Sequence, residues 1–360
     1  MKEEQLKADG ADSRAPKKVL TNGVDRFLAD GVHYRDLVTI GEQITDWASW
    51  PAVWSGFAET TEARGDALLA QGNSLSAADE FFRGALYSHY AQYLYFDDVG
   101  LKEKISIRKH HTFEKAAPLL DRPAETVLFP YKDYKLKAYL RLPRGVDNPP
   151  VAILIGGLDT TKVDYLRVSD LLLARGVATF AFDGPGQGET AFFLRLTPHF
   201  EETISAAIDH LEKRPEVDAK RLGIVGRSMG GYFAPKAAAV DDRIKALVAW
   251  AGMWKLAPMA SFDDANRRGL MFLGNTHTLE ETDEFYRFMN LEGHAQKIKC
   301  PTLVLHGGLD RAMPVSGARQ FADAVSGPVT RLIWDDSGHC NHDRSHYARP
   351  AIADFLANNL

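Results

Sequence analysis

A serine, an aspartate and a histidine each follow a short apolar run in the second half of the sequence. Ser228 follows the run LGIVG, Asp310 follows TLVLHGG, and His339 comes shortly after VTRLIWD. A serine hydroxyl is a weak nucleophile that needs a base, and the base needs an acid that orients it. The three residues therefore predict a catalytic triad, with Ser228 as the nucleophile, His339 as the base and Asp310 as its partner.

The residues around the serine favour this prediction, because they read Gly226-Arg227-Ser228-Met229-Gly230 between an expected strand and an expected helix. In a G-x-S-x-G turn the small residues prevent clashes, and the helix N-terminus presents backbone N–H groups to a developing oxyanion. We expect the N–H of Met229 to be one oxyanion donor. The second is expected from Leu158, in the loop GGLDTT that follows the run VAILI. Asp159, in the same loop, is predicted to cap the following helix, with substrate contact as the alternative.

Two other patterns, one of glycines and one of histidines, do not predict a cofactor. The segment DGPGQGE at residues 183–189 resembles a dinucleotide fingerprint, but Glu189 stands where the third glycine of G-x-G-x-x-G is needed. His339, His342 and His346 form a histidine-rich run without a matching carboxylate or cysteine cluster. We therefore expect no metal and no organic cofactor.

Cys340 is a second potential nucleophile beside the histidine, but Ser228 has the better turn for that role. Cys300 and Cys340 are the only cysteines, which is typical of a reducing compartment.

The apolar runs that precede these residues predict a sheet. They are too short for helices, and they alternate with amphipathic helical stretches from residue 151 onward, as in a parallel sheet covered on both faces. Residues 125–131 and 134–143 predict an antiparallel hairpin before it. The segment 253–299 lacks strand character and contains Trp254, so we interpret it as a lid insertion.

The first third of the chain has helix signals and no strand alternation. Helices are expected from Pro51 to about Gly72, from a capping box at Ser76 and Asp79 to about residue 93, and over residues 101–117. Trp47, Trp50 and Trp54 are expected to pack in the interior. The predicted organisation is a helical cap at residues 1–121, a catalytic core at 122–252 and 300–360, and the lid at 253–299.

Composition excludes several classes of protein. The chain has 360 residues, of which 45% are hydrophobic and 25% charged, with a formal net charge of -5. No basic excess is present to neutralise a phosphate backbone, so nucleic acid is not an expected partner. Residues 1–18 lack the apolar stretch of a signal peptide, and no apolar run approaches the ~18–20 residues of a membrane helix. We expect a cytoplasmic protein without membrane contact.

The motifs GGLDTTK, FDGPGQGE, GRSMGG, LHGGLD and GHCNH, together with the helical first third, resemble one group of the α/β-hydrolase superfamily. This group contains 2,6-dihydroxypseudooxynicotine hydrolase and the fungal polyketide-shortening hydrolases. The resemblance implies an α/β-hydrolase fold with a mostly parallel sheet of about eight strands, helices on both faces and an N-terminal helical cap. It further implies a homodimer, no cofactor, and the triad and oxyanion residues named above.

The resemblance also implies a reaction, since several relatives hydrolyse a carbon–carbon bond beside a ketone. A small-molecule carbonyl substrate is therefore expected, with Gly157, Asp159, Trp254 and Asp263 as candidate contacts. No glutamate occurs between Ser228 and Glu280, so an acidic helper in the lid would be Asp263 or Asp264. Hydrolysis of an aromatic or polyketide-like ketone is the first hypothesis. The alternatives are a carboxylesterase and a catalytically silent binding protein.

Overall fold

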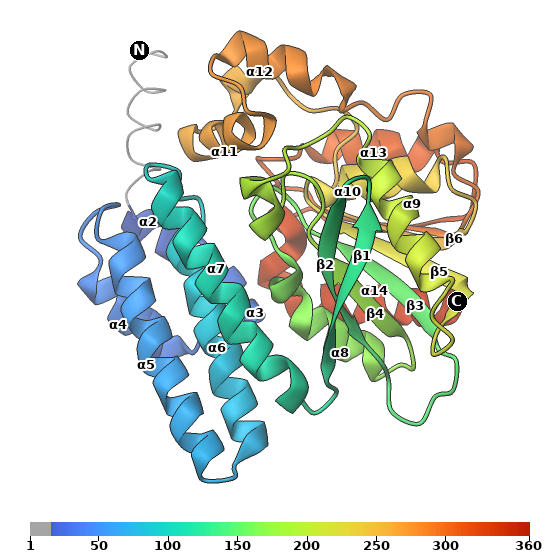
Figure 1. The fold of residues 1–360 in the computed structure, drawn as a ribbon. Coiled ribbons are helices and arrows are strands. Elements are labelled where there is room, and N and C mark those ends of the chain that lie inside the picture. Colours follow the sequence, from blue (N-terminus) through green and yellow to red (C-terminus); the bar gives the residue numbers. More distant parts are fainter. Residues whose placement is uncertain (1–15) are drawn as a thin grey trace, which may run out of the picture. The chain divides into compact units, whose positions relative to one another are not determined.

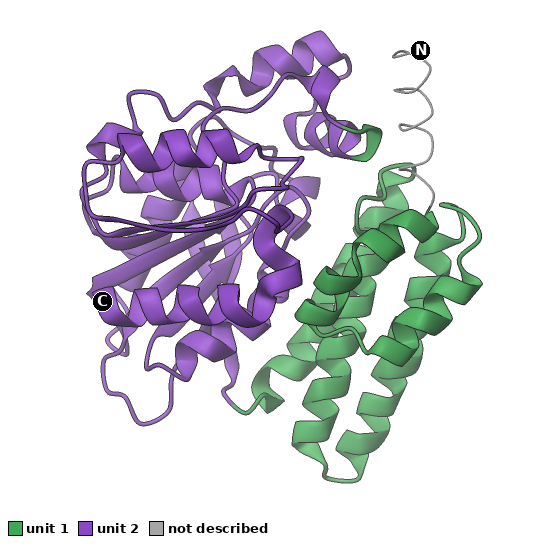
Figure 2. Ribbon diagram, turned by 180° about the vertical axis from the view of Figure 1, so that it is seen from behind, with its two compact units in different colours: residues 1–121, 263–265 green, residues 122–262, 266–360 purple. Residues whose placement is uncertain are grey.

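The computed structural model describes residues 16–360. The chain divides into two compact units, which are described separately here (Figure 2). The first comprises the described residues up to Asp121 together with Asp263–Ala265, and the second comprises Arg122–Phe262 and Asn266–Leu360. Most of the N-terminal segment 1–18, for which neither a signal peptide nor an anchor was expected, lies outside the described residues.

The first unit is helical. Its helices are α2 (Pro16–Asn22), α3 (Val24–Asp30), α4 (Tyr34–Gln43), α5 (Trp50–Ala70), α6 (Ser74–Gln92) and α7 (Val99–Ala116) (Figure 1). The expected capping box at Ser76 and Asp79 is wrong, because α6 begins two residues earlier and both residues lie inside it. The reason is the tight turn at Gly72, whose positive φ of 81° ends α5 and lets the next helix begin at once.

Aromatic side chains form the interior of this unit. Trp50 and Trp54 are fully buried, which confirms that these two tryptophans pack inside the protein. The Trp50 indole N–H donates to the Tyr90 carbonyl at 2.8 Å, so its polar atom is satisfied. The Phe27 ring lies 5.6 Å from Trp54 and 4.5 Å from Tyr90, centroid to centroid. These contacts join α3, α5 and α6.

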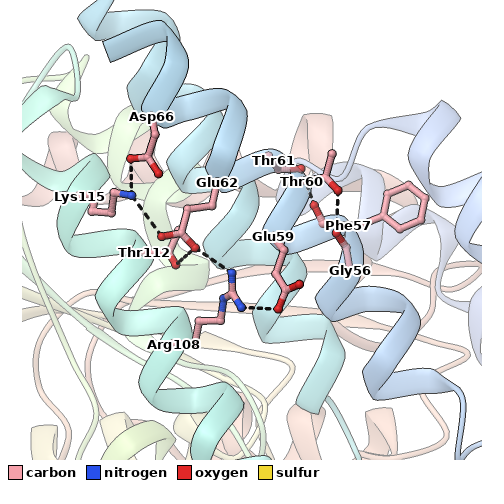
Figure 3. A network of polar contacts seen from close by, with 10 residues as sticks. All are labelled: Gly56, Phe57, Glu59, Thr60, Thr61, Glu62, Asp66, Arg108, Thr112 and Lys115. Carbon is pink, nitrogen blue, oxygen red and sulfur yellow. Dashed lines mark hydrogen bonds and ion pairs between the residues drawn. The ribbon is translucent and has the colours of Figure 1, made fainter. Parts of the chain in front are cut away.

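A polar network joins α5 to α7 (Figure 3). The Glu62 carboxylate accepts from Arg108 at 3.1 Å, from Lys115 at 3.2 Å and from the Thr112 hydroxyl at 3.2 Å. Burial alone would raise the pKa of Glu62, but the hydrogen bonds and charges of Lys115 and Arg108 outweigh it and lower that pKa. Glu62 is therefore ionised at neutral pH and bridges the two helices.

The second unit is built on one eight-stranded sheet. Its strands are β1 (Ala124–Tyr131), β2 (Tyr134–Arg141), β3 (Pro150–Ile155), β4 (Ala178–Phe182), β5 (Asp218–Arg227), β6 (Ile244–Trp250), β7 (Thr302–Gly307) and β8 (Val329–Trp334). They are ordered β1-β2-β4-β3-β5-β6-β7-β8. The pairs β1–β2 and β2–β4 are antiparallel, and all other pairs are parallel. The predicted mostly parallel sheet and its leading hairpin are confirmed.

Helices cover both faces of the sheet (Figure 1). They are α8 (Leu166–Leu173), α9 (Phe200–Leu211), α10 (Gly230–Ala238), α13 (Val315–Ala324) and α14 (Ser345–Asn359). Side chains of α9, α10 and α13 share one buried cluster with Val151, Ile153 and Ile155 of β3, whereas α8 and α14 share a second with Ala152 and Leu154. Alternate residues of a strand point to opposite faces, so a strand buried on both sides is continuously apolar. This explains the run VAILI.

The segment after β6 contains α11 (Asp264–Gly274) and α12 (Leu279–Phe285), joined by short turns and 3-10 stretches. Its interpretation as a lid stays a prediction, as does the role of the first unit as a cap. No helix in residues 16–360 is both long enough and apolar enough to cross a membrane.

Candidate active site

The sheet topology brings two glycine-rich loops together. From β3 the chain continues to β4 on one side and later to β5 on the other, so the winding direction reverses at β3. Ligands of open α/β sheets bind at the carboxyl ends of the strands beside such a reversal. The loop after β3 and the turn after β5 are therefore the expected place for chemistry.

Ser228 occupies the turn between β5 and α10 with a φ of 58°. A non-glycine residue in the left-handed region costs roughly 1–3 kcal/mol and persists where its surroundings enforce it. Here the Ser228 N–H donates to the Trp250 carbonyl at 2.8 Å, and its carbonyl accepts from the Gly231 N–H at 2.7 Å. These bonds hold the backbone in the strained conformation that raises the hydroxyl above the strand end.

The glycines of the motif are required by close backbone contacts. A Cβ on Gly226 would lie 1.9 Å from the Gly230 carbonyl oxygen, and a Cβ on Gly230 would lie 2.4 Å from the Ile155 carbonyl oxygen. Neither approach is possible for a residue with a side chain, so both positions need glycine.

The three predicted triad residues converge. Nε2 of His339 lies 2.9 Å from Oγ of Ser228, and Nδ1 of His339 lies 2.6 Å from Oδ2 of Asp310. Asp310 follows β7 and has a fully buried side chain. Its Oδ1 accepts from the N–H groups of Ala312 and Met313 at 3.0 and 2.8 Å. A carboxylate at Nδ1 keeps the proton on that nitrogen and leaves Nε2 free to accept from the serine.

The surroundings of His339 stabilise its imidazolium form. Burial of the ring disfavours the charged form, but the adjacent Cys340 and the hydrogen-bonded Asp310 carboxylate outweigh it and raise the pKa of His339. A raised pKa stabilises the imidazolium that forms when the base takes a proton from the nucleophile.

His306 is a site residue that the sequence analysis missed. Its Nε2 donates to the Met313 carbonyl at 2.7 Å and lies 3.5 Å from Oδ2 of Asp310. Burial lowers the pKa of His306, so the ring is neutral and adds no charge beside the carboxylate. It fixes the turn that carries the Asp310 side chain. The sequence signal that could have identified His306 is its position in the motif LHGGLD, directly before the glycines Gly307 and Gly308.

The oxyanion roles of Met229 and Leu158 stay predictions, and the structure shows where the two residues lie. Met229 is buried and immediately precedes α10, where the first N–H groups of a helix have no partner inside it. Gly157 lies against Ser228, since a Cβ there would be 2.9 Å from Cβ and 3.3 Å from Oγ of Ser228. Leu158, the next residue, is partly buried and packs on the main core. The loop after β3 thus passes directly beside Ser228.

The remaining predicted contacts have mixed outcomes. Asp159 does not cap the following helix, because Thr161 is the N-cap of the 3-10 helix Lys162–Tyr165 and its N–H donates to Asp164 at 2.8 Å. Two intervening residues separate Asp159 from that helix, so its cap role is wrong. Trp254 is partly buried and packs on the core of the second unit. Asp263 is exposed and groups with the first unit, so substrate contact at Trp254 and Asp263 stays a prediction.

Lys162 and Asp183 form a buried ion pair that the sequence analysis did not predict. Nζ of Lys162 lies 2.8 Å from Asp183 and 2.6 Å from Glu189, and the Lys162 backbone N–H donates to Asp183 at 2.8 Å. The Lys162 side chain has no exposed area. Burial disfavours the ammonium, but the two carboxylates outweigh it and raise the pKa of Lys162. The pair ties the loop after β3 to the loop after β4.

The eight-stranded sheet with helices on both faces, the strained serine turn and the order Ser, Asp, His define the α/β-hydrolase fold. The model of the family described as "Esterase FrsA-like" matches residues 25–274, and the chain belongs to this family.

Relatives with this fold are hydrolases. The chain is 32% identical to 2,6-dihydropseudooxynicotine hydrolase of Paenarthrobacter nicotinovorans over 92% of its own length and 90% of that protein. It is 32% identical to hydrolyase poxO of Penicillium oxalicum over 84% and 86% of the two chains. The crystal structure of the 2,6-dihydroxy-pseudo-oxynicotine hydrolase matches with a TM-score of 0.87, covering 93% of this chain and 95% of that one. The protein is accordingly a hydrolase.

Proposed function

We propose that Ser228, His339 and Asp310 form a catalytic triad that works through an acyl-enzyme. The observation that carries the proposal is the pair of short contacts on the two sides of one imidazole, 2.9 Å to the serine and 2.6 Å to the buried aspartate. A ligand-binding protein has no need of a strained serine held against an oriented base. In the first step His339 takes the hydroxyl proton while Oγ attacks a carbonyl carbon.

The attack produces a tetrahedral oxyanion, for which the N–H groups of Leu158 and Met229 are the proposed donors. Its collapse breaks the bond to the leaving group, which departs with the electron pair and takes the proton from His339. Water, deprotonated by the same imidazole, then attacks the ester carbon and releases a carboxylic acid and Ser228. Each step uses one base and one donor pair, so no redox group is required.

The first proposed substrate is an aromatic or polyketide-like ketone in which the carbonyl–carbon bond is cleaved. Supporting this choice, the chain matches a hydrolase named for 2,6-dihydropseudooxynicotine over nine-tenths of both proteins. A carbon leaving group takes up the electron pair of the broken bond, so its negative charge must be stabilised. In a 1,3-diketone the leaving group is stabilised as an enolate, and a hydroxylated ring stabilises it in a similar way. The second candidate is a carboxylesterase, which the description of the family as esterases favours. The same triad serves both reactions.

A comparison of substrates tests the proposal. The wild-type protein is incubated with a panel of 1,3-diketones and with a short-chain nitrophenyl ester, and the acid products are measured. Diketone cleavage that is lost in Ser228→Ala and retained in Ser326→Ala, an exposed serine whose hydroxyl donates to the Gln296 carbonyl, supports the first candidate. Fast ester turnover without diketone cleavage selects the carboxylesterase. If a fluorophosphonate leaves the wild-type protein unlabelled and neither substrate turns over, the triad is silent and a binding role replaces both.

A further inference from the structure

The loop after β3, which carries the proposed donor Leu158, is held by side chains of residues 183–189. We propose that Gln187 is a positioning residue that fixes the peptide planes of the Gly156 and Gly157 carbonyls and so orients the N–H of Leu158, the proposed donor, for the oxyanion. This inference rests on the proposed function, since it assigns a role in the same acyl transfer. It also gives a role to the DGPGQGE segment, whose glycine spacing departs from the dinucleotide fingerprint.

The Gln187 side chain bridges two loops. Its Nε2 donates to the Gly156 carbonyl at 2.6 Å and approaches the Gly157 carbonyl at 3.4 Å, while its Oε1 accepts from the Gly184 N–H at 3.1 Å. Carbonyl oxygens only accept and a backbone N–H only donates, so the partners determine which end of the amide faces each loop. Gln187 is 1% exposed, and water does not compete for these bonds.

Peptide planarity turns these bonds into an orientation. In a trans peptide the C=O and the N–H of the next residue point in opposite directions. With the Gly156 carbonyl directed at Gln187, the Gly157 N–H is directed away from it. The same relation holds between the Gly157 carbonyl and the Leu158 N–H. One amide therefore sets two successive peptide planes, and Gly157 lies against the nucleophile.

The other end of the same loop is held independently. Both the backbone N–H and the ammonium of Lys162 bond to Asp183. The close packing needs a glycine at position 188, where φ is 48° and a Cβ would lie 2.2 Å from Oδ2 of Asp183. The segment 157–161 is thus anchored at both ends. Gly156 is hydrogen-bonded to Gln187 at the first point, and Lys162 is bonded to Asp183 at the second. Without the first point, the Gly156 and Gly157 carbonyls lose the side-chain hydrogen bonds that orient their peptide planes.

Substitution of Gln187 separates positioning from general stability. Gln187→Met keeps a similar length and volume but removes all three side-chain hydrogen bonds without adding charge. Gln187→Glu keeps the acceptor for Gly184 and turns a carboxylate oxygen toward two carbonyls. The matched control is Thr190→Val, because the Thr190 hydroxyl donates to the Asp183 carbonyl at 3.0 Å, whereas the bonds to the Gly156 and Gly157 carbonyls come from Gln187.

The readouts are the rate of fluorophosphonate labelling, kcat and KM with a nitrophenyl ester, the pH profile and the thermal midpoint. Loss of one oxyanion donor costs about 10²–10³ in rate, and a displaced donor costs less, so we expect acylation to fall about 10- to 100-fold in both Gln187 variants. In the Gln187 variants, KM and the acid dissociation constant that the pH profile gives for His339 should both remain within about twofold of the wild-type values. Thr190→Val should lower only the thermal midpoint.

Two results overturn the inference while leaving the proposed function in place. One is wild-type acylation in Gln187→Met, and the other is an equal loss of acylation in Thr190→Val. If the wild-type protein itself is not labelled at Ser228, the proposed function fails and this inference fails with it.

Discussion

Replacement of Lys162 by methionine should destabilise the second unit strongly. The ammonium is fully buried between Asp183, whose side chain is 2% exposed, and Glu189, whose side chain is 23% exposed. Its folded pKa is raised above the unfolded value near 10.4, so its contribution is fully present at neutral pH and is lost only as the pH rises through the folded pKa. Lys162→Met removes the cation and leaves Asp183 buried.

Removing one partner of a buried pair costs about 3–5 kcal/mol. For a domain of this size about 1 kcal/mol lowers the thermal midpoint by about 2–4 °C, which predicts a decrease of roughly 6–20 °C. Scanning calorimetry at pH 7 measures it. The double variant Lys162→Met/Asp183→Asn should recover part of the loss, because asparagine removes the buried charge and retains an acceptor for the Lys162 backbone N–H.

Lys137→Met is the matched control. Nζ of Lys137 lies 3.7 Å from the same Glu189 carboxylate, but its side chain is 27% exposed, so the cost should stay below about 1 kcal/mol. The reasoning is refuted if Lys162→Met shifts the thermal midpoint no more than Lys137→Met, or if the double variant is less stable than Lys162→Met alone.

Three further predictions follow from the triad and from the helical unit. Asp310→Asn should reduce kcat by about 10³–10⁴ with little change in the thermal midpoint, since it removes the acceptor that sets the imidazole tautomer; near-normal kcat would contradict the assigned role. Because the pKa of His339 is raised, the acidic limb of kcat/KM should have its midpoint above 6.5, with activity lost as the pH falls and the base becomes protonated. A pH profile measures this, and a midpoint below 6.5 would disprove it. Glu62→Gln should destabilise the helical unit by about 2 kcal/mol at pH 7, whereas Glu59→Gln, with a 58% exposed side chain, should cost under about 1 kcal/mol. Since the folded pKa of Glu62 is lowered, the difference between these variants should shrink as the pH falls through that pKa, and urea unfolding at several pH values measures it.

Sequence patterns predicted the sheet because the local composition of the segments β3 to β8 is itself typical of buried strands. A strand buried on both faces must be continuously apolar, and the residue after each strand end must lie at one edge of a parallel sheet. Helix boundaries were less accurate. Ser76 and Asp79 match a capping box, but the turn at Gly72 starts α6 at Ser74, because a neighbouring turn decides among several acceptable N-caps.

The sequence by itself determined the fold class and the convergence of Ser228, Asp310 and His339, because strand order and strand ends constrain where these residues lie. Only the tertiary structure decided the roles of His306, Lys162 and Gln187. Gln187 and Lys162 act through partners from another loop, across 31 residues from Gln187 to Gly156 and 21 from Lys162 to Asp183, whereas His306 acts on the turn after its own strand through the Met313 carbonyl. Such bonds depend on the register of parallel strands and on the exact path of glycine turns. A local sequence pattern does not predict the register or the path of the turns, because hydrogen bonds between distant loops form only when the chain is packed.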